Sequence, residues 1–167
     1  MKVPAPRFIK ILALAVALAA GFAAPARAQD ADQHWGVSIW GLSYHTNHEV
    51  DFESANVGAG LRYYFNHLLF VEADALKNSN RGIAVATSVG LDLKFASLGD
   101  TCKLYVVAAG TVAYYQNERL KRDYFKAGPV PGVTLGCGWL KVNSIVVLQP
   151  KHQPFSSIVA SLTLMFH

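Results

Sequence analysis

Residues 83–95 read Ile-Ala-Val-Ala-Thr-Ser-Val-Gly-Leu-Asp-Leu-Lys-Phe, in which every second side chain is large or β-branched and those between are mostly small or polar. Successive side chains of a β-strand point to opposite faces, so this pattern predicts a strand with one apolar and one polar face. Such a strand is typical of a barrel wall that separates lipid from a lumen. We expect Ile83, Val85, Leu91 and Leu93 on the lipid-facing side.

The same period of two recurs in eight runs of roughly ten residues along the chain. The expected strands span residues 37–47, 55–65, 68–78, 82–95, 102–115, 127–138, 140–150 and 156–166. The connections alternate in length, with the longest at Gln116–Lys126, and outer-membrane barrels have short periplasmic turns and longer outer loops. The sequence therefore predicts an all-β fold, an eight-stranded antiparallel transmembrane β-barrel with both termini in the periplasm.

Two carboxylates, Glu72 and Asp74, share one face of the third run. A charge that faces hydrocarbon is destabilising, so we assign this face to the lumen. Lumenal carboxylates pair most simply with a cation from another strand, such as Arg62 or Lys94. A catalytic acid/base pair formed by the two carboxylates is the alternative interpretation.

The first 28 residues have the organisation of a secretory signal peptide. Three basic residues precede an uncharged run at 11–24, and Ala26-Arg27-Ala28 supplies the small residues of a cleavage site. Cleavage after Ala28 leaves residues 29–167 as one barrel domain, because no linker or repeat divides them. A retained membrane anchor is the alternative, and it requires a longer apolar run.

The formal net charge of +4 arises in this N-terminal segment, because four basic residues precede the expected cleavage site: Lys2, Arg7, Lys10 and Arg27. The rest of the chain is near neutral, whereas a nucleic-acid partner requires a clustered basic face, so we expect none. Three basic residues do lie close together in one expected loop: Arg119, Lys121 and Arg122. A solvated loop is the simplest interpretation, and contact with lipid phosphates is the alternative.

The last run ends in Phe166, followed by His167, and resembles the C-terminal signal that directs outer-membrane proteins to their assembly machinery. We therefore expect the outer membrane of a Gram-negative bacterium as the location and that machinery as a partner. A soluble β-barrel or sandwich around a small-ligand cavity is the alternative. It explains less well why the outward positions carry scarcely any Lys or Glu.

The two cysteines, Cys102 and Cys137, open the fifth run and close the sixth. These positions lie at the same end of an antiparallel pair, so we expect the two Cα atoms within about 7 Å of each other. An exported compartment permits a disulfide, and two buried thiols are the alternative. No ligand-spaced Cys or His accompanies either residue, so the sequence supports neither a metal site nor a catalytic role there.

Three polar residues, His45, Asn78 and Ser79, fall at the outer ends of the first and third runs. Both strands run outward from a periplasmic N-terminus, so we expect His45 and Ser79 at one rim, within about 10–12 Å of each other. A histidine beside a hydroxyl suits acyl transfer, because imidazole can remove and return a proton while polar donors stabilise an oxyanion. The alternative is that they are ordinary loop and turn residues, as we expect for His48 and His67.

Four short motifs follow one another in order along residues 37–166. They are Tyr44-His45 with Asp51, Ala75-Leu76-Lys77-Asn78-Ser79, the stretch Pro129–Gly138, and Leu148-Gln149-Pro150. They resemble, in turn, four features of the lipid A palmitoyltransferase family: an aromatic-His segment, an Ala-x-Lys-Asp-Ser segment, a proline-bearing sixth strand and a proline that closes the seventh. The resemblance implies an eight-stranded barrel that moves a palmitoyl chain from a glycerophospholipid to lipid A and holds the acyl chain inside.

The same resemblance implies His45 as the acid/base, Ser79 as its polar or nucleophilic partner, and Asn78 at the position where the family has Asp. An amide cannot ionise, so Asn78 can orient a neighbour or donate to an oxyanion but cannot act as a carboxylate. The expected function is a monomeric outer-membrane lipid A acyltransferase that works without metal or organic cofactor. A non-catalytic barrel with a structural or binding role and a lipid A deacylase are the alternatives.

Overall fold

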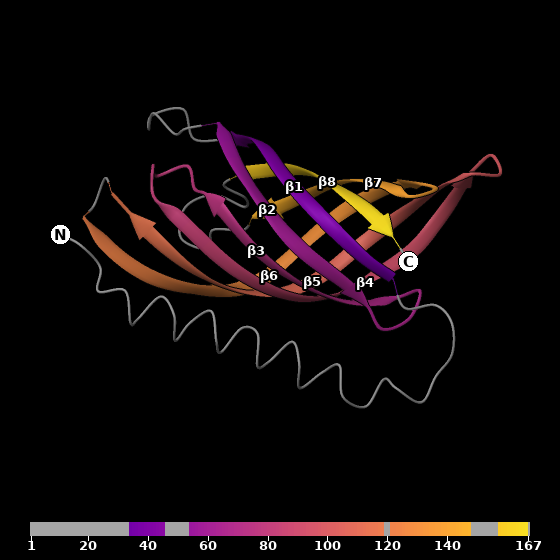
Figure 1. Ribbon diagram of the computed structural model, residues 1–167, viewed down its shortest axis with the longest axis horizontal. Coiled ribbons are helices and arrows are strands. Elements are labelled where there is room, and N and C mark those ends of the chain that lie inside the picture. The colour runs from indigo at the N-terminus through magenta and orange to yellow at the C-terminus, as the bar shows by residue number, and fades with distance from the viewer. Residues whose placement is uncertain (1–33, 46–53, 119–120, 148–156, 167) are drawn as a thin grey trace.

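The computed structural model describes residues 34–45, 54–118, 121–147 and 157–166. These residues form eight antiparallel strands that pair in chain order and close into a barrel (Figure 1). The strands are β1 (His34–His45), β2 (Ala55–Tyr64), β3 (Leu69–Lys77), β4 (Ile83–Leu98), β5 (Cys102–Asn117), β6 (Arg122–Cys137), β7 (Leu140–Val147) and β8 (Ser157–Phe166). The predicted fold class is confirmed.

Some expectations concern residues outside the described ranges. They are the signal peptide at 1–28, His48, Asp51, Arg119 and the segment 148–150. Within the described ranges, no helix has both the length and the apolar character needed to cross a membrane.

The barrel closes where β1 pairs with β8, from Trp35–Phe166 to His45–Ser157 (Figure 1). The start of β1 and the end of β8 therefore lie at one end of the barrel, which we call the terminal end. The short turns after β2, β4 and β6 lie at this end too. His45 and the β3–β4 turn lie at the opposite end, which we call the rim.

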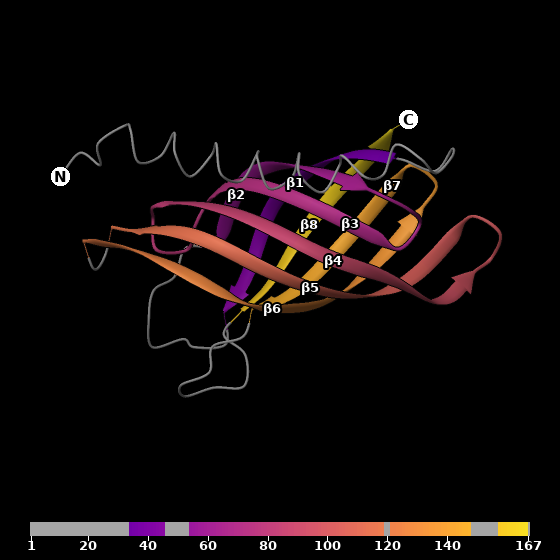
Figure 2. The ribbon, with the colours of Figure 1, turned by 90° about the horizontal axis from the view of Figure 1, so that it is seen from below.

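The β5–β6 hairpin is longer than the sequence predicts. The expected loop at Gln116–Lys126 is wrong, because β5 continues to Asn117 and β6 begins at Arg122. Cross-strand aromatic pairs stabilise this extension. They are Tyr115–Tyr124, stacked at 5.4 Å between ring centroids, and Tyr114–Phe125, tilted at 5.3 Å. Figure 2 shows the hairpin reaching beyond the other strands at the rim.

The outer face of the barrel carries the apolar side chains that the alternation predicts. Ile83 and Leu93 are 49% and 44% exposed, and Leu91 is half-buried. Val85 differs from the expectation, because it is only 8% exposed. It pairs with Ala75 on one side and Tyr114 on the other, so a large aromatic residue stands beside it on the same face.

A buried ion pair joins the neighbouring strands β2 and β3 on the lumenal face of the barrel. Arg62 Nη2 donates to Glu72 Oε2 at 2.6 Å, and the Ser38 hydroxyl donates to the other oxygen of Glu72. Arg62 was one of the two cations that the sequence predicted for these carboxylates, and this pairing is confirmed. Asp74 instead accepts a hydrogen bond from Trp40 Nε1 at 2.7 Å, so Glu72 and Asp74 are engaged with different partners.

A second ion pair joins β4 to β7. Lys141 Nζ donates to Asp92 Oδ2 at 2.8 Å and to the Tyr64 hydroxyl oxygen at 2.7 Å, and Tyr64 in turn donates to Asp92 at 2.5 Å. Lys94 is the other cation that the sequence offered for Glu72 and Asp74, and the structure places it elsewhere. Its side chain is exposed near the end of β4, and the second lumenal cation comes from Lys141 on β7.

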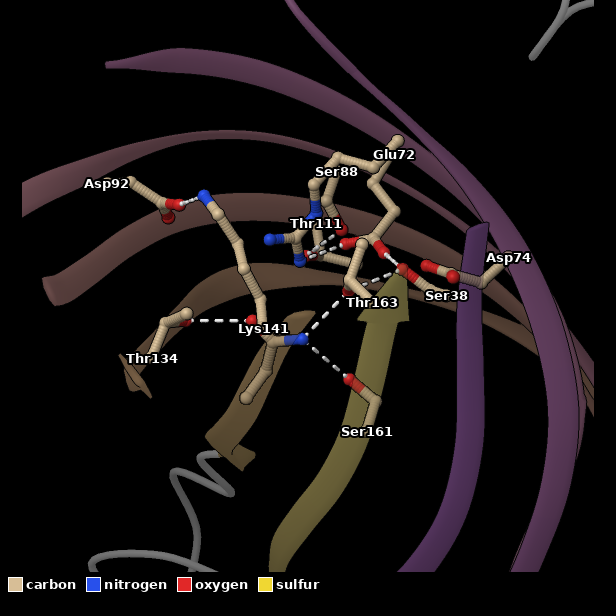
Figure 3. A network of polar contacts seen from close by, with 12 residues as sticks. Ser38, Glu72, Asp74, Ser88, Asp92, Thr111, Thr134, Lys141, Ser161 and Thr163 are labelled. Atoms are coloured by element: carbon tan, nitrogen blue, oxygen red, sulfur yellow. Dashed lines mark hydrogen bonds and ion pairs between the residues drawn. The ribbon is translucent and has the colours of Figure 1, made fainter. Parts of the chain in front are cut away.

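The two ion pairs belong to one polar network inside the barrel (Figure 3). Arg62 Nη1 donates to the Tyr64 oxygen at 3.1 Å, which links the pairs. Ser38 contacts Thr163 at 3.0 Å, and Asn143 Nδ2 donates to Thr163 at 2.9 Å. The network thus joins β1, β2, β3, β4, β7 and β8. An eight-stranded barrel is just wide enough for side chains to fill, and here hydrogen-bonded polar groups fill it. Within the described residues, Arg62 Nε and Asp92 Oδ1 are buried without a hydrogen-bond partner.

Cys102 and Cys137 are register partners in β5 and β6, and they form a disulfide with a Cα–Cα distance of 4.2 Å. The predicted proximity and the predicted bridge are both confirmed. The bridge lies at the terminal end, where it fixes one end of the long hairpin.

We predict that the double variant Cys102→Ser/Cys137→Ser assembles but loses stability. The bridge closes a segment with a sequence separation of 35 residues, and the chain-entropy model gives about 3–4 kcal/mol for a loop of that length. Urea unfolding of the refolded barrel in lipid vesicles measures the loss. Two maleimide-reactive thiols in the unreduced wild-type protein contradict the bridge itself.

We also predict strong coupling within the Arg62–Glu72 pair. Removal of one partner leaves a buried charge without compensation, so Arg62→Met and Glu72→Gln should each cost about 3–5 kcal/mol. The double variant should cost clearly less than the sum of the two. Additive losses in the same urea titration contradict a direct energetic link between the two side chains.

Candidate active site at the rim

A β-bulge at Gly41 exchanges the inward and outward positions in the last residues of β1. The register with β8 shifts between Trp40, which pairs with Ser161, and Leu42, which pairs with Ala160. One extra residue in a strand moves every later side chain to the other face. Trp40 is buried and Leu42 is 67% exposed, so the inward positions change from even to odd numbers here. Ser43 and His45 therefore face the lumen.

Four polar side chains meet where the rim closes over the lumen. Ser79 Oγ lies 2.8 Å from His45 Nε2, and Ser43 Oγ lies 2.9 Å from the same nitrogen. Ser43 donates to Asn56 Oδ1 at 2.8 Å, and Asn56 Nδ2 donates to Ser79 Oγ at 3.1 Å. Ser43 and Asn56 are buried, whereas His45 and Ser79 are half-buried. The buried pair Ser43 and Asn56 thus positions the cluster, while His45 and Ser79 are accessible at the rim.

Asn78 builds the turn that presents Ser79. Its Oδ1 accepts hydrogen bonds from the backbone N–H groups of Asn80 and Gly82, at 2.8 and 3.3 Å. Its Nδ2 donates to the carbonyl oxygen of Gln116 at 2.8 Å, which ties the turn to β5. Gly82 allows this close approach, because a Cβ there would lie 2.1 Å from the Gln116 oxygen. The hydrogen bonds of Asn78 thus hold the turn together and join it to β5, next to the four-residue cluster.

Three of the predicted residues therefore have distinct positions in the structure. His45 and Ser79 are in hydrogen-bond contact, and the expected proximity across the intervening strand is confirmed. Asn78 lies beside the pair as a turn residue. Sequence reasoning missed Ser43 and Asn56. The spacing Ser43-Tyr44-His45 was a usable signal, because residues two apart share a face of a strand.

An opening in strand pairing lies in the rim half of the barrel wall. Among the described residues, β6 pairs with β7 only from Cys137–Leu140 to Gly132–Ile145, although β6 continues to Arg122. Beyond Gly132, the outer wall has an open depression of about 480 Å³. It is lined by Ala108, Ala109, Gly110, Pro129 and Pro131. Prolines have no N–H to leave unpaired, so they suit an unpaired strand edge in an apolar medium.

The register connects this opening with the histidine. Val147 at the end of β7 pairs with Ser157 of β8, and Ser157 pairs with His45 of β1. The end of β7, and with it the unpaired edge of β6, therefore lies in the rim half of the barrel, as His45 does, rather than at the terminal end.

Other candidate groups do not join this cluster. His67 is exposed in the turn between β2 and β3, as expected. Lys121 and Arg122 are exposed at the tip of the β5–β6 hairpin. Within the part of the chain that the structure describes, no group of three or more His, Cys, Asp or Glu residues has an arrangement that could hold a metal ion.

An eight-stranded closed barrel with an apolar outer face and a polar lumen is the architecture of an outer-membrane protein of a Gram-negative bacterium. The sequence bears this out, because residues 14–144 match the family described as outer membrane protein beta-barrel domain, and the chain belongs to that family. Comparison with curated proteins finds no relative that matches significantly. The terminal end, with its short turns, is then periplasmic, and the rim faces outward.

We predict that Asn78→Asp destabilises the barrel by about 1–3 kcal/mol, because it replaces a donor to the Gln116 carbonyl with a second acceptor. Asn66→Asp is a matched control. Asn66 Oδ1 accepts from the backbone of Leu68 and Leu69, and a carboxylate retains both bonds. Urea titrations compare the two variants. If both variants are as stable as the wild type, Asn78 does not have this role in the turn.

Proposed function

We propose that this protein is an outer-membrane acyltransferase that moves a fatty acyl chain from a glycerophospholipid to lipid A. The observation that carries the proposal is the contact of 2.8 Å between His45 Nε2 and Ser79 Oγ. A serine hydroxyl in hydrogen-bond contact with imidazole is the arrangement that activates a weak nucleophile for attack on an ester. The position at the outward rim brings this pair to the leaflet that contains lipid A.

The geometry supports a two-step transfer. Ser79 Oγ attacks the ester carbonyl of the donor while its proton passes to His45 Nε2. The ester C–O bond breaks, and the leaving alkoxide takes the proton from Nε2. A hydroxyl of lipid A then gives its proton to Nε2 and attacks the acyl-serine. The bond between the acyl carbon and Ser79 Oγ breaks, and Oγ takes the proton back from Nε2. The Ser79 hydroxyl is thereby restored, and the transfer needs neither metal nor organic cofactor.

The opening beside β6 supports access of lipid from the membrane. The depression at Pro129 and Pro131 faces lipid and is lined by small side chains and prolines. An acyl chain that enters there meets the wall where β6 has no partner on β7 among the described residues. The deeper lumen is occupied by the network around Arg62 and Glu72, which favours a substrate site near the rim over an open pore.

The role of Asn78 in the turn bears on the resemblance to the lipid A palmitoyltransferases. Asn78 stands where that family has Asp, and its side chain is hydrogen-bonded to the turn and to the Gln116 carbonyl of β5. The proton transfers proposed above use only His45 and Ser79. The amide is therefore compatible with the proposed chemistry, and we assign Asn78 a positioning role.

The test is mass spectrometry of lipid A from cells with and without this chain. An added acyl mass that depends on the protein supports the proposal. Lost acyl chains would identify a deacylase, in which water replaces lipid A as acceptor, and unchanged lipid A would identify a non-catalytic barrel.

His45→Ala and Ser79→Ala should each lower the lipid A modification at least about 100-fold, because proton transfer by a positioned side chain contributes about 10²–10⁴-fold. Ser88→Ala is the control, since Ser88 is an inward hydroxyl that contacts Thr111 at 2.7 Å on β4 and β5, apart from the rim cluster. All three variants should retain the heat-modifiable gel mobility of a folded barrel. Full activity of both rim variants contradicts the assigned roles.

A further inference from the structure

The rim cluster places two hydroxyls on a single nitrogen. Ser79 Oγ and Ser43 Oγ lie 2.8 and 2.9 Å from His45 Nε2. A neutral imidazole nitrogen without a proton accepts one hydrogen bond, and the same nitrogen with a proton donates one. The two hydroxyls therefore cannot hold the same role at the same time. One must donate to Nε2 before proton transfer, and the other is placed to accept from it afterwards.

Asn56 decides which hydroxyl donates. Its Oδ1 lies 2.8 Å from Ser43 Oγ, and its Nδ2 lies 3.1 Å from Ser79 Oγ. The amide oxygen thus accepts a hydrogen bond from the Ser43 hydroxyl, and the amide nitrogen donates one to the Ser79 oxygen. The Ser79 O–H has two acceptors in reach, Asn56 Oδ1 at 3.4 Å and His45 Nε2 at 2.8 Å. The contact with His45 is the shorter one, and Asn56 Oδ1 already accepts from Ser43, so the Ser79 O–H donates to Nε2.

Burial keeps Asn56 and Ser43 in these hydrogen bonds. Asn56 is 5% exposed and Ser43 is 6% exposed, so neither can easily exchange its partner for bulk water. The bulge at Gly41 places Ser43 on the same inner face as His45, and β2 supplies Asn56 from the next strand. β1, β2 and the β3–β4 turn that contains Ser79 therefore fix the two hydroxyls beside one imidazole nitrogen.

We propose, building on the proposed function, that Asn56 and Ser43 are positioning residues that direct the proton of Ser79. In the resting site, Asn56 directs the Ser79 proton towards His45. After Ser79 Oγ attacks, Nε2 carries that proton. Ser43 Oγ then accepts a hydrogen bond from the new N–H, while the Ser43 hydroxyl still donates its own hydrogen bond to Asn56. The imidazolium is stabilised by a hydroxyl that is already in place, so no side chain has to reorganise during the step.

The test uses an alkyl fluorophosphonate and the full chain refolded in lipid vesicles. Ser79 Oγ forms a bond to phosphorus, the P–F bond breaks, fluoride leaves, and the Ser79 proton goes to His45. Peptide mass spectrometry locates the label and gives both the limiting labelling rate and the probe concentration for half-saturation. The control is again Ser88→Ala, which should match the wild type.

We expect Ser43→Ala and Asn56→Ala each to lower the limiting rate at Ser79 at least about tenfold, with the half-saturating concentration unchanged. Asn56→Asp separates positioning from simple packing. The carboxylate has the shape of the amide but draws the Ser79 proton away from His45, so it should label no faster than Asn56→Ala. A packing role predicts the reverse order.

Three results would overturn the inference. Wild-type labelling rates in Ser43→Ala and Asn56→Ala, or faster labelling of Asn56→Asp than of Asn56→Ala, reject the positioning roles and leave the proposed function intact. Absence of label on Ser79 in the unaltered, folded protein rejects both together. Heat-modifiable gel mobility of each variant identifies a loss that is due only to misfolding.

Discussion

Hydrocarbon offers no hydrogen-bond partner to a backbone N–H or C=O group, and the closure of this sheet satisfies that constraint. The pairing of β1 with β8 gives each strand two neighbours, although among the described residues β6 has no partner on β7 between Arg122 and Pro131. Closure also creates two surfaces with opposite requirements. The outer surface must be apolar, whereas the inner surface is too narrow for bulk water and must satisfy its own polar groups. The pairs Arg62–Glu72 and Lys141–Asp92 follow from the second requirement.

The rim cluster depends on a local exception to the same alternation. Without the extra residue at Gly41, the inward positions of β1 would continue through Leu42 and Tyr44, and His45 would face lipid. The bulge costs a regular ladder at one point, close to the rim. In return, Ser43 and His45 face Asn56 and Ser79, and a polar cluster forms where the lumen meets the outer surface.

Several features were predictable because they depend on local pattern and strand order. Alternation in residues 83–95 predicted the wall, and antiparallel order predicted the meeting of Cys102 with Cys137. The same order brought His45 and Ser79 to one rim. The hairpin length was mispredicted, because Gln116–Lys126 is polar enough for a loop but its strand pairing is stabilised by aromatic residues on the facing strand. A cross-strand partner is not visible in a window of one strand.

The sequence by itself determined the alternation of side chains, the order of the strands, which face of each strand is apolar, and which residues lie at which end of the barrel. These follow from a side-chain period of two and from short turns, which act over a few residues. Tertiary structure alone decided that Lys141 rather than Lys94 pairs with a buried carboxylate, and that Asn56 lies between Ser43 and Ser79. Those contacts depend on the tilt of the strands and on a one-residue shift at Gly41, which fix distances across the lumen between residues far apart in the chain.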